Sequence, residues 1–370
     1  MRILLTGGGS GGHIMPILAV VKSIKQQTRE EAEFLFVGSV NKETRGILEA
    51  EGIRVKNVFC GKMRRYFSLQ NFLDLFKIPL GLIQAFWVVF FYMPDVVFCK
   101  GGYASMPGAV AAWFFRLPII IHESDTIPGL TNRIIGKLAR VVIISFEKPL
   151  EYFPKEKTVL LGNPVRKDLL QGNPGVILGK LFSATSRKPL ILILGGSQGA
   201  VSLNNVVLET LPRLLKEASV IHQCGKLDFE NVVATAKQIL GEDLAGKGYF
   251  PASFISDELP DIFAAADLII TRAGANSLAE IALLGKPSII IPLQNSAGCH
   301  QRENAFEFQR SGASVVIEHE NLTPNLFLTE IGKIIYNSEL AKAMGENAKK
   351  LAYPGADEKI AELVLKVGSI

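Results

Sequence analysis

Short aliphatic runs alternate with longer helical patterns along the whole chain. In the first half these runs cover residues 2–5, 33–37, 95–99, 119–122 and 141–145. In the second half they cover residues 190–194, 220–223, 267–271, 288–292 and 314–317. Nearly continuous apolar strands separated by helices are typical of βαβ units, whose parallel sheet is buried on both faces. The pattern therefore predicts an α/β chain with two parallel sheets, each in a Rossmann-like domain.

The boundary between the two halves is expected within residues 161–175, LGNPVRKDLLQGNPG. Pro, Gly and Asn cluster there and the hydrophobic periodicity is lost, which is typical of a linker. We place one domain over residues 1–163 and the second over residues 164–352, with a hinge near Pro164. Residues 353–370 are expected to form a C-terminal helix that packs back against the first domain.

Length and composition agree with two globular domains. The chain has 370 residues, 48% of them hydrophobic and 20% charged, which is enough apolar material for two cores and excludes general disorder. Its four cysteines are far apart and no histidine stands at zinc-finger spacing, so neither a disulfide framework nor a structural zinc is expected. The apolar run at the N-terminus is too short for a signal peptide, so we expect the protein in the cytoplasm.

The charge is distributed unevenly between the two halves. Residues 1–165 contain 20 Lys and Arg against 13 Asp and Glu, whereas residues 166–370 contain 20 against 22. A basic first half suits an anionic partner such as a phospholipid surface or a polyphosphate, although a solvated charged face would give the same count. No nucleic-acid partner is expected.

Residues 78–93, IPLGLIQAFWVVFFYM, form an uncharged apolar segment. Its 16 residues fall short of the roughly 20 that a membrane-spanning helix needs. A buried crossover helix and a helix partly exposed to a bilayer surface both remain open. In the preceding sequence KMRRY at residues 62–66, cations next to aromatic side chains would suit an anionic lipid surface, and a solvated loop is the alternative.

Each half begins with an apolar strand that runs into glycines and then into a helix. The first loop is GGGSGGH at residues 7–13 and the second is GGSQG at residues 195–199. Backbone N–H groups and the positive end of the following helix favour anionic oxygens at such a position, and glycine allows their close approach. A purely structural turn is the alternative. The sequence therefore predicts one phosphate-binding loop in each domain.

Two familiar kinds of nucleotide site do not fit these loops. The first loop matches GxGxxG, but no acidic residue follows the second strand to hold the ribose of a dinucleotide, because Val37 leads into Gly38 and Ser39. The second loop lacks the Gly-Lys-Ser/Thr ending of a P-loop, which argues against kinase or ATPase chemistry.

Polar residues at other strand ends complete the candidate site. Glu280 lies in a helix after the sequence TRAGANS, where a carboxylate could accept both hydroxyls of a ribose; an exposed helical Glu is the alternative. The residues His300, Gln301 and Asn304 could orient sugar hydroxyls.

Candidate catalytic groups are few. His13 ends the first glycine loop and is positioned to act as a general base, or as a ligand for phosphate or for the acceptor. Asp125, after a strand in HESD, is the second candidate for the base. Arg166 could stabilise the charge of a leaving group. Without an HExxH or Asp-x-Asp motif, no metal and no cofactor are expected.

Together, the segments GGGSGGH, KGGYASMPG, HESDTIPGLTN, GNPVR, GGSQGA, TRAGANSLAE and HQRENA resemble the MurG family over residues 3 to about 305. These enzymes convert lipid I to lipid II in peptidoglycan synthesis. The resemblance implies a GT-B fold, in which two Rossmann-like domains face a cleft. It also implies an inverting transfer of N-acetylglucosamine from UDP-N-acetylglucosamine to the 4-hydroxyl of the muramyl unit of undecaprenyl-pyrophosphoryl-MurNAc-pentapeptide.

The resemblance also assigns roles to individual residues and domains. The first domain would face the membrane and hold the acceptor, with Gly8 and Gly9 at its pyrophosphate, and the second would bind the UDP-sugar. His13 would be the base. The donor would contact Ser10, Gly11, Gly12, Arg166, Ser197, Ile255, Ala275, Asn276, Ser277, Glu280 and Gln301. The family further implies a peripheral location on the cytoplasmic face of the cell membrane and a place in a cell-wall synthesis complex.

Two departures from the family and three alternatives remain. Asp125 stands where several members have Asn, and His300 where others have Gln. Another GT-B lipid glycosyltransferase or UDP-sugar enzyme is the first alternative, and a nucleotide-sugar binding protein without turnover is the second. A dinucleotide-dependent oxidoreductase ranks below both because the ribose-binding acid is missing.

Overall fold

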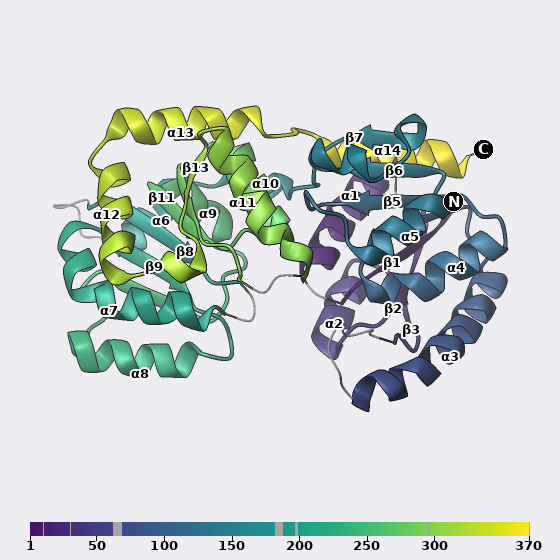
Figure 1. Ribbon diagram of the computed structural model, residues 1–370, viewed down its shortest axis with the longest axis horizontal. Helices are drawn as coiled ribbons and strands as arrows, with labels where there is room; N and C mark the ends of the chain where they lie inside the picture. Colours follow the sequence, from purple (N-terminus) through teal and green to yellow (C-terminus); the bar gives the residue numbers. More distant parts are fainter. Residues whose placement is uncertain are drawn as a thin grey trace. The chain divides into compact units, whose positions relative to one another are not determined.

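The computed structural model describes residues 1–9, 11–29, 31–61, 69–181, 188–196, 199–294 and 297–369. The chain divides into two compact units (Figure 1). The first unit contains Met1–Val165 together with Tyr353–Ile370, and the second contains Arg166–Ala352.

The sheet of the first unit has seven parallel strands in the order β3-β2-β1-β4-β5-β6-β7. The strands are β1 (Arg2–Gly7), β2 (Glu33–Gly38), β3 (Arg54–Asn57), β4 (Val96–Gly101), β5 (Ile119–Glu123), β6 (Val141–Ile144) and β7 (Thr158–Leu160). From β1 the order runs outwards in both directions, first through β2 to β3 and then through β4 to β7. Ligands of open α/β sheets bind at such a switch point, at the carboxyl ends of the strands.

Helices cover both faces of this sheet. They are α1 (Gly11–Thr28), α2 (Lys42–Ala50), α3 (Leu69–Tyr92), α4 (Met106–Phe114), α5 (Leu130–Leu138) and α14 (Ala356–Gly368). Ile3 and Leu5 of β1 pack in one core with α1 and α14, whereas Leu4 packs in another core with α3, α4 and α5. This alternation follows the two-residue period of a strand. The last helix of the chain is thus part of the core of the first unit.

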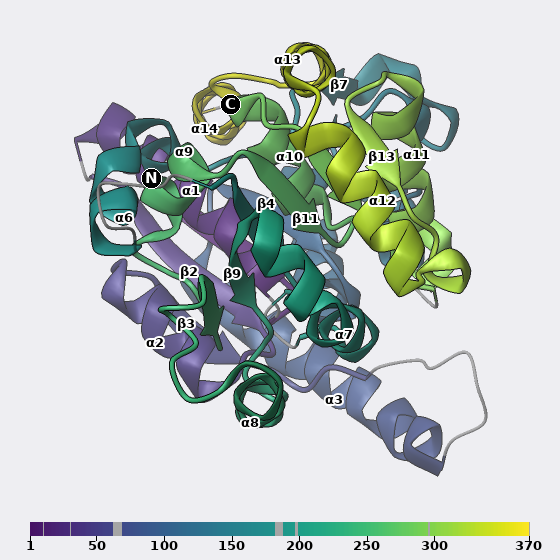
Figure 2. The same cartoon turned by 90° about the vertical axis from the view of Figure 1, so that its left-hand side faces the viewer.

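The second unit repeats the plan with six parallel strands in the order β10-β9-β8-β11-β12-β13. The strands are β8 (Leu190–Leu194), β9 (Ser219–Gln223), β10 (Tyr249–Ala252), β11 (Leu268–Thr271), β12 (Ser288–Ile290) and β13 (Ser314–Val316). The helices are α6 (Pro174–Leu181), α7 (Val201–Glu217), α8 (Phe229–Leu240), α9 (Leu259–Ala265), α10 (Ala275–Leu284), α11 (His300–Arg310), α12 (Pro324–Ile335) and α13 (Ser338–Lys350). Helices α7 and α8 lie side by side, as the views in Figures 1 and 2 show.

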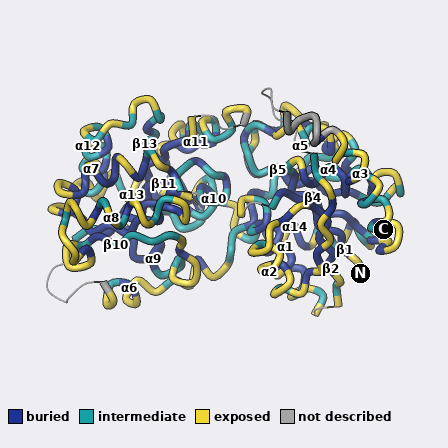
Figure 3. Tube along the Cα trace, turned by 90° about the horizontal axis from the view of Figure 1, so that it is seen from below, coloured by how far each residue is buried: buried dark blue, intermediate teal, exposed yellow. Residues whose placement is uncertain are grey.

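The prediction of two parallel-sheet Rossmann-like domains is confirmed, and the strands of both sheets are largely buried (Figure 3). All ten predicted runs overlap strands. The sequence reasoning missed β3, β7 and β10, which lie at sheet edges. Edge strands are covered less completely, so they need no continuous apolar run; in β3 only Val55 is buried.

The apolar segment at residues 78–93 lies mainly within α3. Among the described residues, no helix combines the length and the apolar character needed to cross a membrane. Ala85, Val89 and Tyr92 are buried against the sheet, whereas Trp87 and Phe91 point to solvent. The helix α3 is therefore partly exposed, and its contact with a bilayer surface stays a prediction.

Candidate functional site

The first glycine loop joins β1 to α1 at the switch point of the sheet. Gly8 donates its backbone N–H to the carbonyl oxygen of Gly101, at the end of the neighbouring strand β4, over 3.0 Å. Gly11 and Gly12 are exposed and begin α1, so their amides lie at the positive end of that helix. Ser10 lies outside the described residues. The loop and the end of β4 thus form one edge at which an anionic group could bind.

The ring of His13 lies against two glycines. A Cβ atom added to Gly8 would lie 2.8 Å from His13 Nδ1, and one added to Gly102 would lie 3.1 Å from Nε2. Side chains at these positions would therefore displace the imidazole. Desolvation and the charge of Lys100 lower the pKa of His13 to about 4, against the opposite effect of Asp125. At neutral pH the imidazole is uncharged and can accept a proton.

Glu123 holds the loop that carries Asp125. Its Oε1 accepts the backbone N–H of Asp125 over 2.9 Å, while its Oε2 accepts the Asn132 side-chain amide over 2.8 Å and the Gly129 N–H over 3.2 Å. Burial raises the pKa of the Glu123 carboxyl. The neighbouring His122 is buried, and its Nε2 lies 3.0 Å from the Gly162 carbonyl oxygen, so it belongs to the core.

Lys100 is the charged member of this group that the sequence reasoning missed. It is the penultimate residue of β4 and only 2% exposed, and its Nζ has no hydrogen-bond partner among the described residues. Desolvation lowers the pKa of its ammonium, while Glu123 and Asp125 act in the opposite direction. The signal in the sequence was a lysine placed directly before the two glycines of KGGYASMPG.

In the second unit, Glu280 and Arg166 lie within electrostatic reach of each other. Desolvation raises the pKa of Glu280 to about 7, while Arg166 acts to lower it and Asp168 to raise it further. Arg166 also lies beside Asp168, with Nε 3.7 Å from Oδ1. The structure therefore brings together the predicted ribose-binding acid and the predicted diphosphate-binding cation.

The first turn of α10 carries three more residues that were predicted to contact the UDP-sugar. Ala275, Asn276 and Ser277 open this helix directly after Gly274, so their backbone N–H groups lie at its positive end. Arg272, just before this turn, has a buried Nη1 without a hydrogen-bond partner among the described residues. The sequence reasoning did not single out this arginine, although it stands in the TRAGANS motif at the end of β11. In the neighbouring glycine loop, Ser197 lies outside the described residues.

Three polar side chains brace the loops around this edge. The Ile255 N–H is donated to Gln223 Oε1 over 2.9 Å, so one of the backbone groups expected to meet a uracil is already bonded. Gln301 Oε1 accepts the N–H of Leu293 over 3.0 Å. Asn304 is fully buried and donates to the Ala273 carbonyl over 3.2 Å. We therefore assign Asn304 to holding the loop after β11 rather than to binding sugar hydroxyls.

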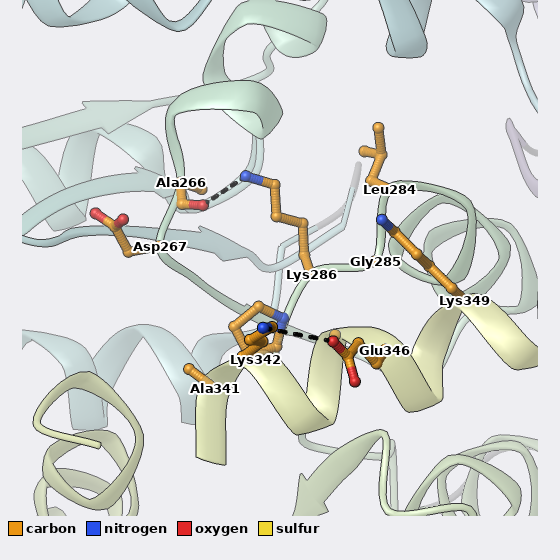
Figure 4. A pocket seen from close by; sticks show the side chains of 11 residues that line it. Ala266, Asp267, Leu284, Gly285, Lys286, Ala341, Lys342, Glu346 and Lys349 are labelled. Atoms are coloured by element: carbon orange, nitrogen blue, oxygen red, sulfur yellow. Dashed lines mark hydrogen bonds and ion pairs between the residues drawn. The ribbon is translucent and has the colours of Figure 1, made fainter. Parts of the chain in front are cut away.

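A surface pocket lies in the second unit near the residues where β11 and β12 begin (Figure 4). The charged side chains described below have structural roles there. It is lined by residues that precede β11 and β12 and by residues of α13. Lys286 Nζ donates to the carbonyl oxygens of Ala264 and Ala266, each over 2.9 Å, and the Lys342 ammonium faces Glu346 at 4.0 Å. Lys286 thus binds carbonyl oxygens at the end of α9, and Lys342 forms an ion pair within α13. In the part of the chain that the structure describes, no three His, Cys, Asp or Glu side chains are grouped to hold a metal ion.

Models of two protein domains match the chain, one in each half. Residues 3–144 match the glycosyltransferase family 28 N-terminal domain, and residues 190–362 match its C-terminal domain. A protein of Clostridium botulinum is 37% identical over 369 residues, covering 99% of both chains, and one of Bacillus cereus is 38% identical over 344 residues, covering 92% of this chain and 93% of its own. Both relatives are named UDP-N-acetylglucosamine–N-acetylmuramyl-(pentapeptide) pyrophosphoryl-undecaprenol N-acetylglucosamine transferase, the Bacillus protein with the number 2.

Solved structures give the same result. The crystal structure of Acinetobacter baumannii MurG superposes with a TM-score of 0.74 at 26% identity, and the match covers 99% of each chain. A UDP-GlcNAc 2-epimerase from Neisseria meningitidis, bound to UDP-GlcNAc, superposes with a TM-score of 0.68 at 16% identity, covering 99% of this chain and all of its own. At that identity the epimerase shows the shared fold alone.

Proposed function

This chain belongs to the MurG enzymes of glycosyltransferase family 28, and from that premise we propose how its own residues carry out their reaction. It is a hexosyltransferase that moves N-acetylglucosamine from UDP-N-acetylglucosamine to the 4-hydroxyl of the muramyl unit of lipid I, which gives lipid II in peptidoglycan synthesis. The observation that carries this function is the identity of 37% to a named transferase over 99% of both chains. The alternative of another UDP-sugar enzyme is not favoured, because the epimerase shares only the fold.

We propose that His13 takes the proton of the acceptor hydroxyl. The oxygen attacks C1 of the sugar, the bond between C1 and the UDP oxygen breaks, and UDP leaves with the electron pair. The uncharged imidazole is ready to accept the proton, and the nearby Asp125 carboxylate stabilises the imidazolium that forms. Gly8 and Gly9 are proposed to line the site of the acceptor's pyrophosphate, with the N-terminus of α1 at its anionic oxygens.

We propose that the UDP-sugar binds at the carboxyl ends of the strands of the second sheet. Glu280 is proposed to accept the ribose hydroxyls, and Arg166 with Ser197 to meet the diphosphate, whose negative charge increases as UDP leaves. The amides of Ala275, Asn276 and Ser277 lie at a helix N-terminus, which supports binding of the same diphosphate and the ribose. Ile255 is proposed to hold the uracil through its backbone carbonyl oxygen, Gln301 to bind the sugar, and Ser10, Gly11 and Gly12 to contact the donor sugar.

Membrane association is proposed for an aromatic face on α3 and α4. We define this face by Trp87, Phe90, Phe91, Trp113 and Phe114, which are between 45% and 77% exposed. The rings of Trp87, Phe90 and Phe91 contact one another, and those of Trp87 and Phe91 stack with centroids 5.9 Å apart. So large an exposed apolar patch is typical of an interaction site.

The chemistry around the aromatic face suits an anionic phospholipid surface. The exposed Arg116 follows Phe114 closely, and the first half of the chain has an excess of basic residues. The cations of residues 62–66 lie outside the described residues. We propose a peripheral location on the cytoplasmic face of the cell membrane, where the lipid-linked acceptor and a cell-wall synthesis complex would be within reach.

The function is tested by transfer of radiolabelled N-acetylglucosamine from its UDP donor to a lipid I analogue, with UDP release as a second readout. The wild-type protein is expected to form labelled lipid II product and UDP in equal amounts. UDP release without labelled product would contradict the acceptor, and binding of UDP-sugar without either product would contradict the transferase.

A further inference from the structure

Lys100 is a buried cation for which the proposed reaction has no role so far. Its stem lies against the first glycine loop, because a Cβ added to Gly7 would lie 3.4 Å from Lys100 Cβ and 3.7 Å from His13 Cβ. Its Nζ is buried and has no hydrogen-bond partner among the described residues. An ammonium group removed from water is costly unless charges around it compensate. The charged neighbours of Lys100 must therefore compensate the burial of its ammonium group.

The groups that act electrostatically on Lys100 come from its own strand and from β5. They are Cys99 on β4, Glu123 at the end of β5 and Asp125 in the following loop, while His13 on α1 and His122 on β5 respond to its charge. The turn Tyr103–Ser105 packs on β4 and adds one titratable group, Tyr103. Two carboxyl groups and two imidazoles thus interact electrostatically with one ammonium group.

Glu123 and Asp125 are placed differently with respect to this ammonium. The Glu123 carboxylate already accepts three hydrogen bonds and serves as the anchor of its loop. Asp125 is partly exposed, as a group that meets substrate must be. A positive charge at Lys100 disfavours the cation of His13, which flanks the same glycine, Gly7.

We propose that Lys100 is a positioning residue for the transfer step, whose buried ammonium beside the first glycine loop keeps the His13 imidazole uncharged before the acceptor's proton is taken. This inference rests on the proposed function, because it gives a role to Lys100 only if His13 is the base.

The test compares the wild-type protein with Lys100→Met, which keeps the length of the side chain and removes its charge. Lys155→Met is the control, since it removes the same charge from an exposed turn of the same unit. The kinetic readouts are kcat and the donor KM between pH 3.5 and 9, a range that includes the acidic limb of the wild type. For Lys100→Met we expect the acidic limb of the kcat profile to move toward neutral pH by about one pH unit, with an unchanged donor KM. Lys155→Met should match the wild type.

A second readout does not depend on turnover. The chain has five histidines, so the His13 resonances can be assigned by comparison with His13→Ala and titrated by NMR. In Lys100→Met the His13 midpoint should rise by a similar amount, while Lys100→Arg, which restores the charge, should return toward the wild-type value. Should Lys100→Met not fold, Lys100→Gln carries the same test.

The outcomes separate the inference from the proposed function. A folded Lys100→Met protein with the wild-type kcat profile and the wild-type His13 midpoint would overturn the role of Lys100 and leave the transferase intact. A wild-type protein that makes no lipid II would defeat the proposed function, and an unchanged His13 midpoint in Lys100→Met would then separately defeat the electrostatic link.

Discussion

The hydroxyl of Ser23 donates a buried hydrogen bond to the carboxylate of Asp357, and this contact joins the first helix of the chain to the last. Both side chains are almost fully buried. Ile360 and Val364, one and two turns further along α14, lie in the same core as Ile3 and Leu5 of β1. The C-terminal helix is thus held to the first unit by a polar contact next to apolar packing.

Replacing Asp357 by Ala is expected to lower the free energy of unfolding of the first unit by about 1–3 kcal/mol, because Ser23 loses its buried acceptor. Both tryptophans of the chain, Trp87 and Trp113, belong to the first unit, so fluorescence-detected urea unfolding reports on that unit. Glu362→Ala is the control, since it removes a carboxylate from an exposed position of the same helix. Equal unfolding midpoints for the two variants would show that the contact contributes nothing.

The central strands could be predicted from the sequence because strands covered on both faces carry unbroken apolar runs. Ile119, Ile120 and Ile121 of β5 are examples, each almost fully buried. The edge strand β3, with the sequence RVKN, has no such run, and its pairing with β2 depends on the rest of the sheet. Local pattern therefore gives the interior of a parallel sheet, whereas its edges are set by tertiary contacts.

His13→Ala is expected to lower kcat by about 100-fold or more at unchanged donor KM, because the proton of the acceptor hydroxyl loses its base. Since the pKa of His13 is lowered to about 4, the base is uncharged at higher pH, and wild-type kcat should stay constant from pH 8 down to about 5 and fall below that. The measurement is the kcat profile of the transfer assay. A midpoint near 6.5, the ordinary value for histidine, would contradict this environment.

Asp125→Asn provides the comparison with His13→Ala. Asp125 raises the pKa of His13, so its loss should move the acidic limb to lower pH, opposite to the effect of Lys100→Met. We expect a smaller fall in kcat than for His13→Ala, because the base itself is retained. A larger fall at the same donor KM would make Asp125 the base instead.

Glu280→Gln is expected to raise the donor KM about tenfold at pH 8, because a charged acceptor for the ribose hydroxyls becomes neutral. The pKa of Glu280 is raised to about 7, so its carboxylate becomes protonated as the pH falls through 7. The wild-type donor KM should therefore rise between pH 8 and pH 6, whereas that of Glu280→Gln should change little. Glu339→Gln, at an exposed position of α13, is the control. Parallel pH profiles of wild type and Glu280→Gln would remove Glu280 from the donor site.

Several residues of the candidate site could be proposed from the sequence, but their surroundings could not. Glycines before a helix, a histidine at the end of the loop and a carboxylate at a strand end can be read along the chain. The burial of Lys100 cannot, because it depends on β4 lying next to β1, which are far apart in sequence. In the same way, the sequence does not show that the buried Asn304 side chain donates a hydrogen bond to the Ala273 carbonyl oxygen.

The double variant Trp87→Ser with Phe91→Ser is expected to lower binding to vesicles that contain anionic phospholipid by about tenfold or more, because two large apolar side chains no longer enter the bilayer surface. Both residues are more than half exposed, so the fold should be retained. Activity toward a water-soluble acceptor analogue should equal that of the wild type, which separates membrane binding from catalysis. Binding is measured by co-sedimentation with the vesicles.

Leu227→Ser is the matched control for this experiment, since Leu227 is 82% exposed but lies in the second unit. It should bind vesicles like the wild type if the aromatic face on α3 and α4 is the membrane site. Vesicles of neutral phospholipid should bind the wild-type protein more weakly, because the basic side chains near the face gain nothing from them. Equal loss of binding in Leu227→Ser and the double variant would mean that exposed apolar residues act without regard to position, and the aromatic face would then lose its assignment.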